Sequence, residues 1–300
     1  MLNGHDVIEI DYKTTPLEKI KKRLLFEKPA IVFTHLTFHN IYPIESVLNL
    51  YREIHKATGA NFIHVCKDAR ITDRYMAPLS SYFSAALVGN KELQKNGSAA
   101  WKIPVYYVPY FCMTYDKMAI PSKDLMFREA VFTGSIEAHK DRREFISKLS
   151  KEIPIKIFKT QSSNDLRSRT PELSVSAKCI LGLCTGYDIS FFDVRPFQYL
   201  GTGACMIMRK FKGMDDFIPD NLYYPIYSYD NDGVELAAEH YKKILNTDTR
   251  PMQEEAFKFM QANYNSKIKI AEILKLLKDD LIVYKKVDVR KEDRTWIKQI

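Results

Sequence analysis

The sequence predicts an α/β protein made of two successive domains, each with a mostly parallel sheet covered by helices. Short apolar runs alternate with longer stretches that carry apolar residues at helical spacing. The alternation stops at 113–125, which has no sustained period, and then starts again. Strands that alternate with helices indicate βαβ units, which place parallel strands in one sheet and helices on both faces.

The first half shows the alternation from its start. Strands are expected at Val7–Ile10, Ala30–Thr34, Phe62–Cys66, Ala85–Val88 and Val105–Val108. Helices are expected where Leu17, Ile20 and Leu24 and then Ile44, Val47, Leu48 and Tyr51 recur at helical spacing, and at Tyr75–Phe83. Thr15, Pro16 and Glu18 are typical of a capping box at the first helix, and Gly59 is typical of the stop after the second.

The second half repeats the pattern after Met113–Leu125, which we interpret as the linker between the two domains. Strands are expected at Ala130–Thr133, Ile155–Phe158, Cys179–Leu183 and Ala204–Met208, and an extended segment at Leu222–Tyr227. Helices are expected after Asp141, which would cap the first of them, and at Val234–Leu245, Glu254–Tyr264 and Ser266–Leu277.

Two such arrays are expected to form two Rossmann-like domains that face a central cleft, with ligands beyond the carboxyl ends of the strands. We expect an N-terminal domain at residues 1–115, a C-terminal domain at 116–280 and a charged tail at 281–300. The first domain is expected to lack its opening strand, because Asn3-Gly4-His5-Asp6-Val7 resembles the end of a helix that runs into a second strand.

Composition narrows the classes of function. Lysine and arginine exceed aspartate and glutamate by 45 − 37 = 8, which fits a solvated surface or an anionic partner such as a nucleotide diphosphate, a nucleic acid or a membrane surface. The five cysteines lie in apolar runs without a C-x-x-C pair, so we expect free thiols in a reducing compartment. No apolar run is long enough to span a membrane, and no secretory signal is recognisable, so the expected location is cytoplasmic.

The first candidate site follows the predicted strand that ends at Thr133. Gly134 and Ser135 form a turn there, and a helix with Arg142 near its start comes next. Glycine lets backbone N–H groups approach a ligand, a helix N-terminus favours an anion, and basic side chains add charge-assisted bonds to phosphate. The segment is a candidate diphosphate site, although an ordinary strand–helix turn with a basic surface has the same pattern.

The second candidate site runs from Asp193 to Ala204. Arg195 precedes a proline that can open a short helix, and Gln198 lies three residues further along the same side. The helix ends at Gly201-Thr202-Gly203, and a strand follows at once. A compact helix–turn–strand connection would explain the glycines, but the combination of charge, amide and two glycines favours a binding site.

These two segments resemble the C-terminal domain of group-1 glycosyltransferases of the GT-B fold, especially the branch of spore-maturation-like proteins. In that family a strand ending in Phe-x-Gly-Ser leads into an arginine-containing helix, as Phe132-Thr133-Gly134-Ser135 and Arg142 do here. A segment of the type Arg-x-Phe-Glu-x-x-x-x-Gly comes later, and here it begins Arg195-Pro196-Phe197-Gln198. The resemblance covers about residues 100–280, and its motifs are moderately specific.

The resemblance implies a donor site for a nucleotide-diphosphate sugar. Gly134, Ser135 and Arg142 would hold the diphosphate, and Arg195 would offset charge on the leaving group. The backbone at Gly201, Thr202 and Gly203 would approach the donor. Gln198 replaces the ribose-binding glutamate of the family, and Ser190 stands at an earlier acidic position of some relatives, with Asp188 and Asp193 nearby as acids that could compensate.

The acceptor side has three candidate bases. His35 and His39 follow the predicted strand Ala30–Thr34, and Asp68 follows Phe62–Cys66. Each could take the proton of an acceptor hydroxyl, or could form a structural hydrogen bond at a strand end. The histidines lack the spacing of a metal site, and GT-B enzymes generally need no bound metal, so neither a metal nor a cofactor is expected.

The sequence thus predicts a metal-independent, hexosyltransferase-like enzyme that moves a sugar from a nucleotide-diphosphate sugar to an unidentified glycan, protein, lipid or small molecule. Gln198 and Ser190 leave open a catalytically degenerate module that binds nucleotide sugar. The positive net charge leaves open a nucleic-acid-directed glycosyltransferase or binding protein.

Overall fold

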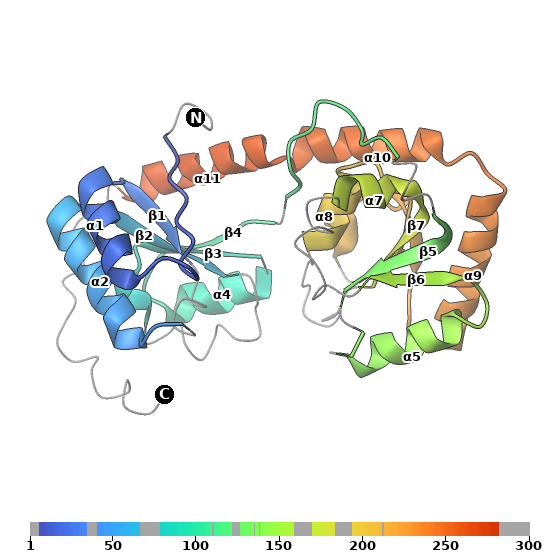
Figure 1. The fold of residues 1–300 in the computed structure, drawn as a ribbon, viewed down its shortest axis with the longest axis horizontal. Helices are drawn as coiled ribbons and strands as arrows, with labels where there is room; N and C mark the ends of the chain where they lie inside the picture. The colour runs from blue at the N-terminus through green and yellow to red at the C-terminus, as the bar shows by residue number, and fades with distance from the viewer. Residues whose placement is uncertain are drawn as a thin grey trace. The chain divides into compact units, whose positions relative to one another are not determined.

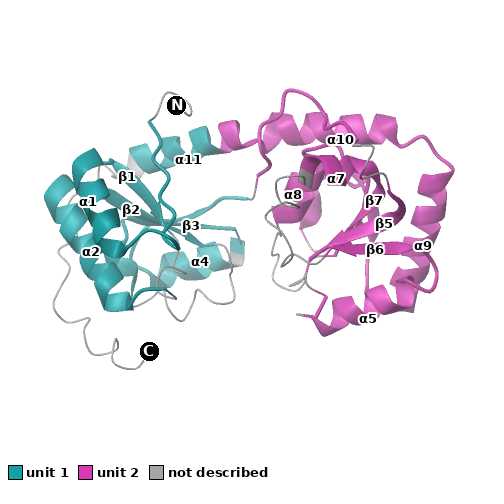
Figure 2. Cartoon of the chain, in the orientation of Figure 1, with its two compact units in different colours: residues 1–109, 270–300 teal, residues 110–269 magenta. Residues whose placement is uncertain are grey.

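The structure is a computed structural model of the 300-residue chain. It describes residues 6–34, 41–66, 79–89, 91–109, 111–121, 127–134, 136–137, 139–158, 170–183, 194–211 and 213–281. The chain forms two compact units, of which unit 1 is Met1–Pro109 with Ile270–Ile300 and unit 2 is Tyr110–Lys269 (Figure 2). The predicted tail 281–300 lies almost entirely outside the described residues and stays a prediction.

Unit 1 contains a parallel sheet in the order β1-β2-β3-β4 among its described strands. Its elements are α1 (Leu17–Glu27), β1 (Ile31–Thr34), α2 (Ile44–Thr58), β2 (Asn61–Cys66), the 3₁₀ turn η2 (Ser80–Tyr82), β3 (Ala85–Val88), α4 (Lys91–Ala100) and β4 (Val105–Tyr107). The four predicted strands from Ala30 to Val108 are confirmed, with small differences at their ends.

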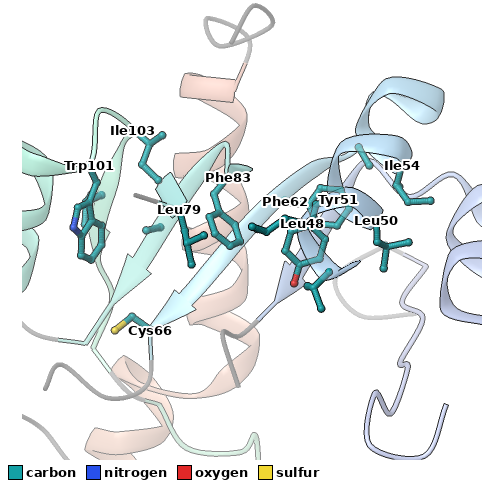
Figure 3. Packing of buried hydrophobic residues seen from close by; sticks show 14 of the residues in the cluster. Leu48, Leu50, Tyr51, Ile54, Phe62, Cys66, Leu79, Phe83, Trp101 and Ile103 are labelled. Carbon is teal, nitrogen blue, oxygen red and sulfur yellow. The ribbon is translucent and has the colours of Figure 1, made fainter. Parts of the chain in front are cut away.

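The core of unit 1 lies where α1 and α2 cover the sheet. Tyr51 of α2 stacks on Phe62 of β2 with ring centroids 4.5 Å apart, and Phe83 meets the edge of Tyr51 at 5.8 Å (Figure 3). The Tyr51 hydroxyl also shares a 2.6 Å hydrogen bond with the Thr34 hydroxyl at the end of β1. One aromatic side chain therefore fixes α2 against two neighbouring strands.

Unit 2 contains a parallel sheet in the order β6-β5-β7-β8-β9, of which Figure 1 labels β6, β5 and β7. Its strands are β5 (Phe127–Thr133), β6 (Ile155–Phe158), β7 (Ala177–Gly182), β8 (Met206–Arg209) and β9 (Tyr224–Ile226). Its helices are α5 (Lys140–Leu149), α7 (Thr170–Ser176), α8 (Val194–Leu200), α9 (Asn231–Leu245) and α10 (Arg250–Asn263), with 3₁₀ turns η5 (Met214–Asp216) and η6 (Asp220–Leu222). The next helix, α11 (Ser266–Leu281), starts in unit 2 and continues in unit 1.

Both faces of the central part of the unit 2 sheet are buried, because alternate residues of β5, β7 and β8 enter two different cores. Phe132 of β5 packs in a core with α5 and α9. Val131, its neighbour in the chain, packs in the other core with α8 and α10. Helices therefore cover the sheet on both sides, as Figure 1 shows.

Three local predictions are wrong. Residues 6–10 form no strand, and Val7 is 66% exposed. The predicted capping box is absent, because the Thr14 hydroxyl and the Thr15 N–H both bind Asp11, and α1 begins at Leu17 after Pro16. The turn that these bonds form at Asp11 follows residues 6–10 directly, so the chain turns where the predicted strand would have ended. Asp141 lies inside the first turn of α5 and does not cap that helix.

Two helices, α4 and α7, were not predicted from the sequence. Helix α4 contains Gly97, and glycine inside a helical pattern weakens the periodic signal. The tertiary structure explains this glycine, because a Cβ atom at Gly97 would lie 3.1 Å from the ring of the fully buried Trp101.

The predicted stop at Gly59 is confirmed and can be tested by substitution. Gly59 has φ +74°, and its N–H donates to the His55 carbonyl at 2.8 Å. A Cβ atom there would meet nothing within 4 Å, so Gly59→Ala should cost only backbone strain, about 1 kcal/mol of unfolding free energy. Gly59→Asn should cost less, since asparagine tolerates the left-handed region. Urea unfolding measures both, and an alanine variant as stable as the wild type would contradict this account.

Candidate functional site

The unit 2 sheet has one point where its strand order reverses. The chain runs from β5 outward to β6, and the next strand, β7, lies on the opposite side of β5. In open parallel sheets, ligands bind outside the carboxyl ends of the two strands that flank such a reversal. The described strands of unit 1 follow one another in chain order and show no such reversal. The topology therefore points to the carboxyl ends of β5 and β7.

The structure brings two of the predicted site residues together at this point. A Cβ atom on Gly134, directly after β5, would lie 3.1 Å from Nη1 of Arg195 and 3.2 Å from the Phe132 ring. Gly134 has φ +144°, which residues with a side chain rarely adopt. The glycine therefore lets the guanidinium of Arg195 lie against the end of the strand, although 61 residues separate the two in sequence (195 − 134 = 61).

The N–H group of Gly134 has a different role from the predicted one. It donates to the Phe158 carbonyl at the end of β6, at 3.0 Å. This group is thus committed to the sheet and is not directed at a ligand. The reason for glycine at this position is the close approach of Arg195, not the exposure of its own N–H.

Arg195 is carried by the first turn of α8. Phe197 and Leu200 are fully buried and hold α8 on the sheet, while Arg195 is half-buried and Gln198 is exposed. The Tyr199 hydroxyl forms a short hydrogen bond with the Thr133 hydroxyl at the end of β5. The buried side chains and this hydrogen bond hold α8 against the strand that precedes Gly134, and they thereby determine where Arg195 lies relative to Gly134.

Arg142 lies close to the same strand end but is buried. It sits in the first turn of α5 with 3% of its surface exposed, and its guanidinium lies 5.5 Å from the centroid of the Phe132 ring. Two guanidinium groups thus lie near the carboxyl end of β5, one half-buried and one packed on an aromatic ring. The direct bond from Arg142 to a diphosphate stays a prediction.

The turn Gly201-Thr202-Gly203 has its own packing reasons. A Cβ atom on Gly201 would overlap Cys112, and one on Gly203 would overlap Met118. The Thr202 hydroxyl is buried and bonds the Ser174 hydroxyl at 2.6 Å and the Tyr199 carbonyl at 2.7 Å. Side chains of the same unit therefore fill the space beside both glycines, and a role of this turn in donor binding stays a prediction.

The remaining predicted site residues lie outside the described part of the chain. They are Ser135, Ser190 and Asp193 of the donor site, and the candidate bases His35, His39 and Asp68. The strands that precede the bases end at Thr34 and Cys66.

An ion cluster at the end of β8 was missed by the sequence reasoning. Lys210 Nζ lies 2.7 Å from Asp215 and also bonds Asp220, whose other oxygen accepts the Tyr223 hydroxyl at 2.7 Å. Hydrogen bonds to Asp215 and Asp220 raise the pKa of Lys210. Partial burial alone would raise the pKa of Asp220, but the bonds from Lys210 and Tyr223 outweigh it and lower that pKa. The residues of this cluster are not spaced periodically in the sequence, so no helical or strand pattern predicts that they lie together.

Within the described ranges, no group of three or more histidine, cysteine, aspartate or glutamate side chains could hold a metal ion. In the same part of the chain, no helix has the length and apolarity that a membrane crossing requires.

Solved structures share this architecture. TarM matches with a TM-score of 0.58 and 12% identity over 87% of this chain and 58% of its own. Anabaena Alr3699/HepE, solved in complex with UDP and glucose, matches with a TM-score of 0.56 and 9% identity, over 88% of this chain and 81% of its own. A glycosyltransferase from Rickettsia africae ESF-5 matches with a TM-score of 0.54 and 14% identity, over 91% of this chain and 84% of its own. The chain has the GT-B fold.

The GT-B fold is shown by structure and not by sequence. No protein-family model matches the sequence, and no curated protein matches it. This chain spans 58% of the length of TarM. At these identities the similarity establishes the fold alone.

The contact between Gly134 and Arg195 can be tested with a double-mutant cycle. Gly134→Ala should lower the unfolding free energy by about 1–3 kcal/mol through backbone strain and crowding. Arg195→Ala should relieve the crowding part, so we expect a coupling of roughly 0.5–1 kcal/mol between the two substitutions. Urea unfolding of the two single variants and the double variant measures it. Strictly additive effects would show that the guanidinium does not occupy this space.

The ion cluster makes a prediction about pH. Folding lowers the pKa of Asp220, so the ionised carboxylate stabilises the folded state at pH values above the pKa that Asp220 has in the unfolded chain. This stabilisation is lost as the pH falls through the pKa of the folded state. Lys210→Met should therefore lower the Tm at pH 7 by about 1–3 °C, and the difference from wild type should shrink as the pH approaches 3. Thermal unfolding between pH 3 and pH 7 measures this, with Lys148→Met as a control at an exposed lysine bonded to the Asn231 amide. A difference that does not depend on pH would contradict the assignment.

Proposed function

We propose that the chain is a glycosyltransferase that moves a sugar from a nucleotide-diphosphate sugar to an acceptor hydroxyl. The observation that carries the proposal is the Arg195 guanidinium against Gly134, at the reversal of strand order in the unit 2 sheet. The GT-B fold and the resemblance of both segments to group-1 glycosyltransferases of the spore-maturation-like branch support it. The acceptor class is left open.

The reaction requires positive charge where Arg195 lies. The bond between the sugar C1 and the diphosphate oxygen breaks, the acceptor oxygen bonds to C1, and the acceptor proton passes to a base. Negative charge develops on the departing diphosphate. A guanidinium held in a half-buried place offsets this charge and matches phosphate oxygens with its planar fork of donors. The proposal therefore assigns this role to Arg195 and not to a metal ion.

Other residues complete the proposed donor site. Ser135 and Arg142 are proposed for the diphosphate side. Gln198 is proposed for the ribose or sugar hydroxyls, with Asp193 nearby in sequence as the acid that compensates for the missing glutamate. His35, His39 and Asp68 remain the candidates for the base.

Gln198 favours one alternative function. The resembling family has a glutamate here, and the exposed amide of Gln198 can bind hydroxyls but carries no charge. A protein with this change could bind nucleotide sugar without turning it over. The same site would then serve a binding module.

The donor site is tested by thermal shifts with a panel of nucleoside diphosphates and nucleotide sugars. A ligand at a hundred times its Kd stabilises the folded state by about 2.7 kcal/mol, which gives a clear rise in Tm. Arg195→Ala should weaken binding of the preferred nucleotide roughly 10- to 100-fold, the value of a lost charged hydrogen bond. Arg250→Ala is the matched control, since Arg250 is 60% exposed on α10 and pairs with Glu254.

No shift with any compound, or equal shifts in wild type and Arg195→Ala, would sink the site assignment. Enzyme and binding module are separated by measuring donor consumption with a panel of acceptors. Consumption supports the transferase. Tight binding without consumption supports the module, and Gln198→Glu should then strengthen ribose-dependent binding.

A further inference from the structure

Two glutamines of α10 hold the turn between α8 and β8. Gln253 Nε2 donates to the Gly203 carbonyl at 2.9 Å, and Gln261 Nε2 donates to the Gly201 carbonyl at 2.9 Å. Both bonds reach the C-terminal end of α8, the helix whose first turn carries Arg195. The two side chains are chemically identical and make the same type of bond to neighbouring residues of one turn.

Gln261 makes further bonds that Gln253 does not share. Its Nε2 also donates to the Met113 carbonyl at 3.1 Å, and its Oε1 accepts the Tyr115 N–H at 3.0 Å. The other bond of Gln253, at 3.4 Å, comes from the Thr249 hydroxyl at the start of its own helix. Gln261 thus joins α10 and the end of α8 to the segment at 112–119, which we call the strap.

The strap is packed tightly on the end of α8. The Cys112 N–H donates to the Tyr264 carbonyl at 2.9 Å, and the Ala119 N–H donates to the Thr202 carbonyl at 3.1 Å. Cys112 fills the space beside Gly201, and Met118 fills the space beside Gly203. Cys112 packs so closely on Gly201 that a Cβ atom there would overlap the Cys112 Cβ. This close packing and the bonds of Gln261 and Ala119 couple the position of the strap to that of the turn after α8.

The other end of α8 is the proposed nucleotide site. The helix spans Val194–Leu200, so its ends are only roughly 10 Å apart at 1.5 Å per residue. A helix this short moves as a unit, and Arg195 moves with Gly201. Binding groups displaced by about 1 Å can lose much of their effect.

We propose that Gln261 is a positioning residue of the nucleotide site. It locks the strap to the Gly201 end of α8 and thereby holds the Arg195 guanidinium at Gly134, where it meets a diphosphate. The inference rests on the proposed function of this site. Since the linkage acts in both directions, a bound nucleoside diphosphate also tightens the strap.

The test compares Gln261→Leu with its matched control Gln253→Leu. Each variant loses one bond to a carbonyl of the same turn, and Gln261→Leu also loses its bonds to the Met113 carbonyl and the Tyr115 N–H of the strap. A merely structural role therefore predicts a larger fall in Tm for Gln261→Leu but comparable nucleotide affinities for the two folded variants. UDP, GDP and ADP are titrated by calorimetry, and the tightest is used throughout. We expect Gln261→Leu to raise its Kd about tenfold and Gln253→Leu to raise it less than about twofold.

Two further variants separate the role of the Gln261 Nε2 donor from that of its Oε1 acceptor. Gln261→Lys keeps a donor for the Gly201 and Met113 carbonyls and should recover most of the affinity. Gln261→Glu keeps only an acceptor for the Tyr115 N–H and should bind as weakly as the leucine variant.

Hydrogen exchange at the Tyr115 amide provides the second readout. In the wild type, the bound nucleotide should slow this exchange, and in Gln261→Leu the exchange should be fast with or without it. Equal effects of the two leucine variants on Kd, or wild-type exchange that does not respond to bound nucleotide, would overturn the positioning role and leave the proposed function intact. A wild type that binds none of these three nucleotides and no other compound of the nucleoside diphosphate and nucleotide sugar panel would overturn both.

Discussion

The candidate site depends on one steric constraint, the absence of a side chain at Gly134. The backbone there has φ +144°, and the position that a Cβ atom would take is bordered by the Arg195 guanidinium and the Phe132 ring. A side chain at this position would crowd the guanidinium and would also place strain on the backbone. A cation is thus fixed where the strand order of the sheet reverses, which is the place that parallel sheets of this kind offer to a ligand.

The packing of unit 2 explains why the chemistry gathers at this edge. Alternate residues of β5, β7 and β8 enter two separate cores, so both faces of the central part of the sheet are closed to polar ligands. Two groups of charged side chains lie at the carboxyl ends of the strands: Arg195 meets Gly134 beyond β5, and Lys210 joins Asp215 and Asp220 beyond β8. The first of these groups is proposed to bind a ligand, and the second is satisfied by its own carboxylates.

The turn after α8 shows how one glycine-rich motif can have two explanations. Gly201 and Gly203 suit a backbone that approaches a ligand, and they equally suit a backbone packed against Cys112 and Met118. The contacts of Gly201 and Gly203 are with packed side chains of the protein. The turn is nevertheless connected to the proposed site, because Gln261 bonds it to the strap and helix α8 links it to Arg195.

The sequence by itself determined the α/β class, most of the strands and the helix stop at Gly59, and it indicated Gly134 and Arg195 as candidate site residues. These follow from local signals, namely apolar runs, helical spacing and glycine at turns. Only the tertiary structure decided that Gly134 and Arg195 are neighbours, that the Gly134 N–H belongs to the sheet, and that Gln261 joins three segments. The side-chain amide of Gln261 bonds backbone carbonyls that are 60 and 148 residues away in sequence. Such bonds depend on the tertiary fold, and no periodic sequence pattern predicts them.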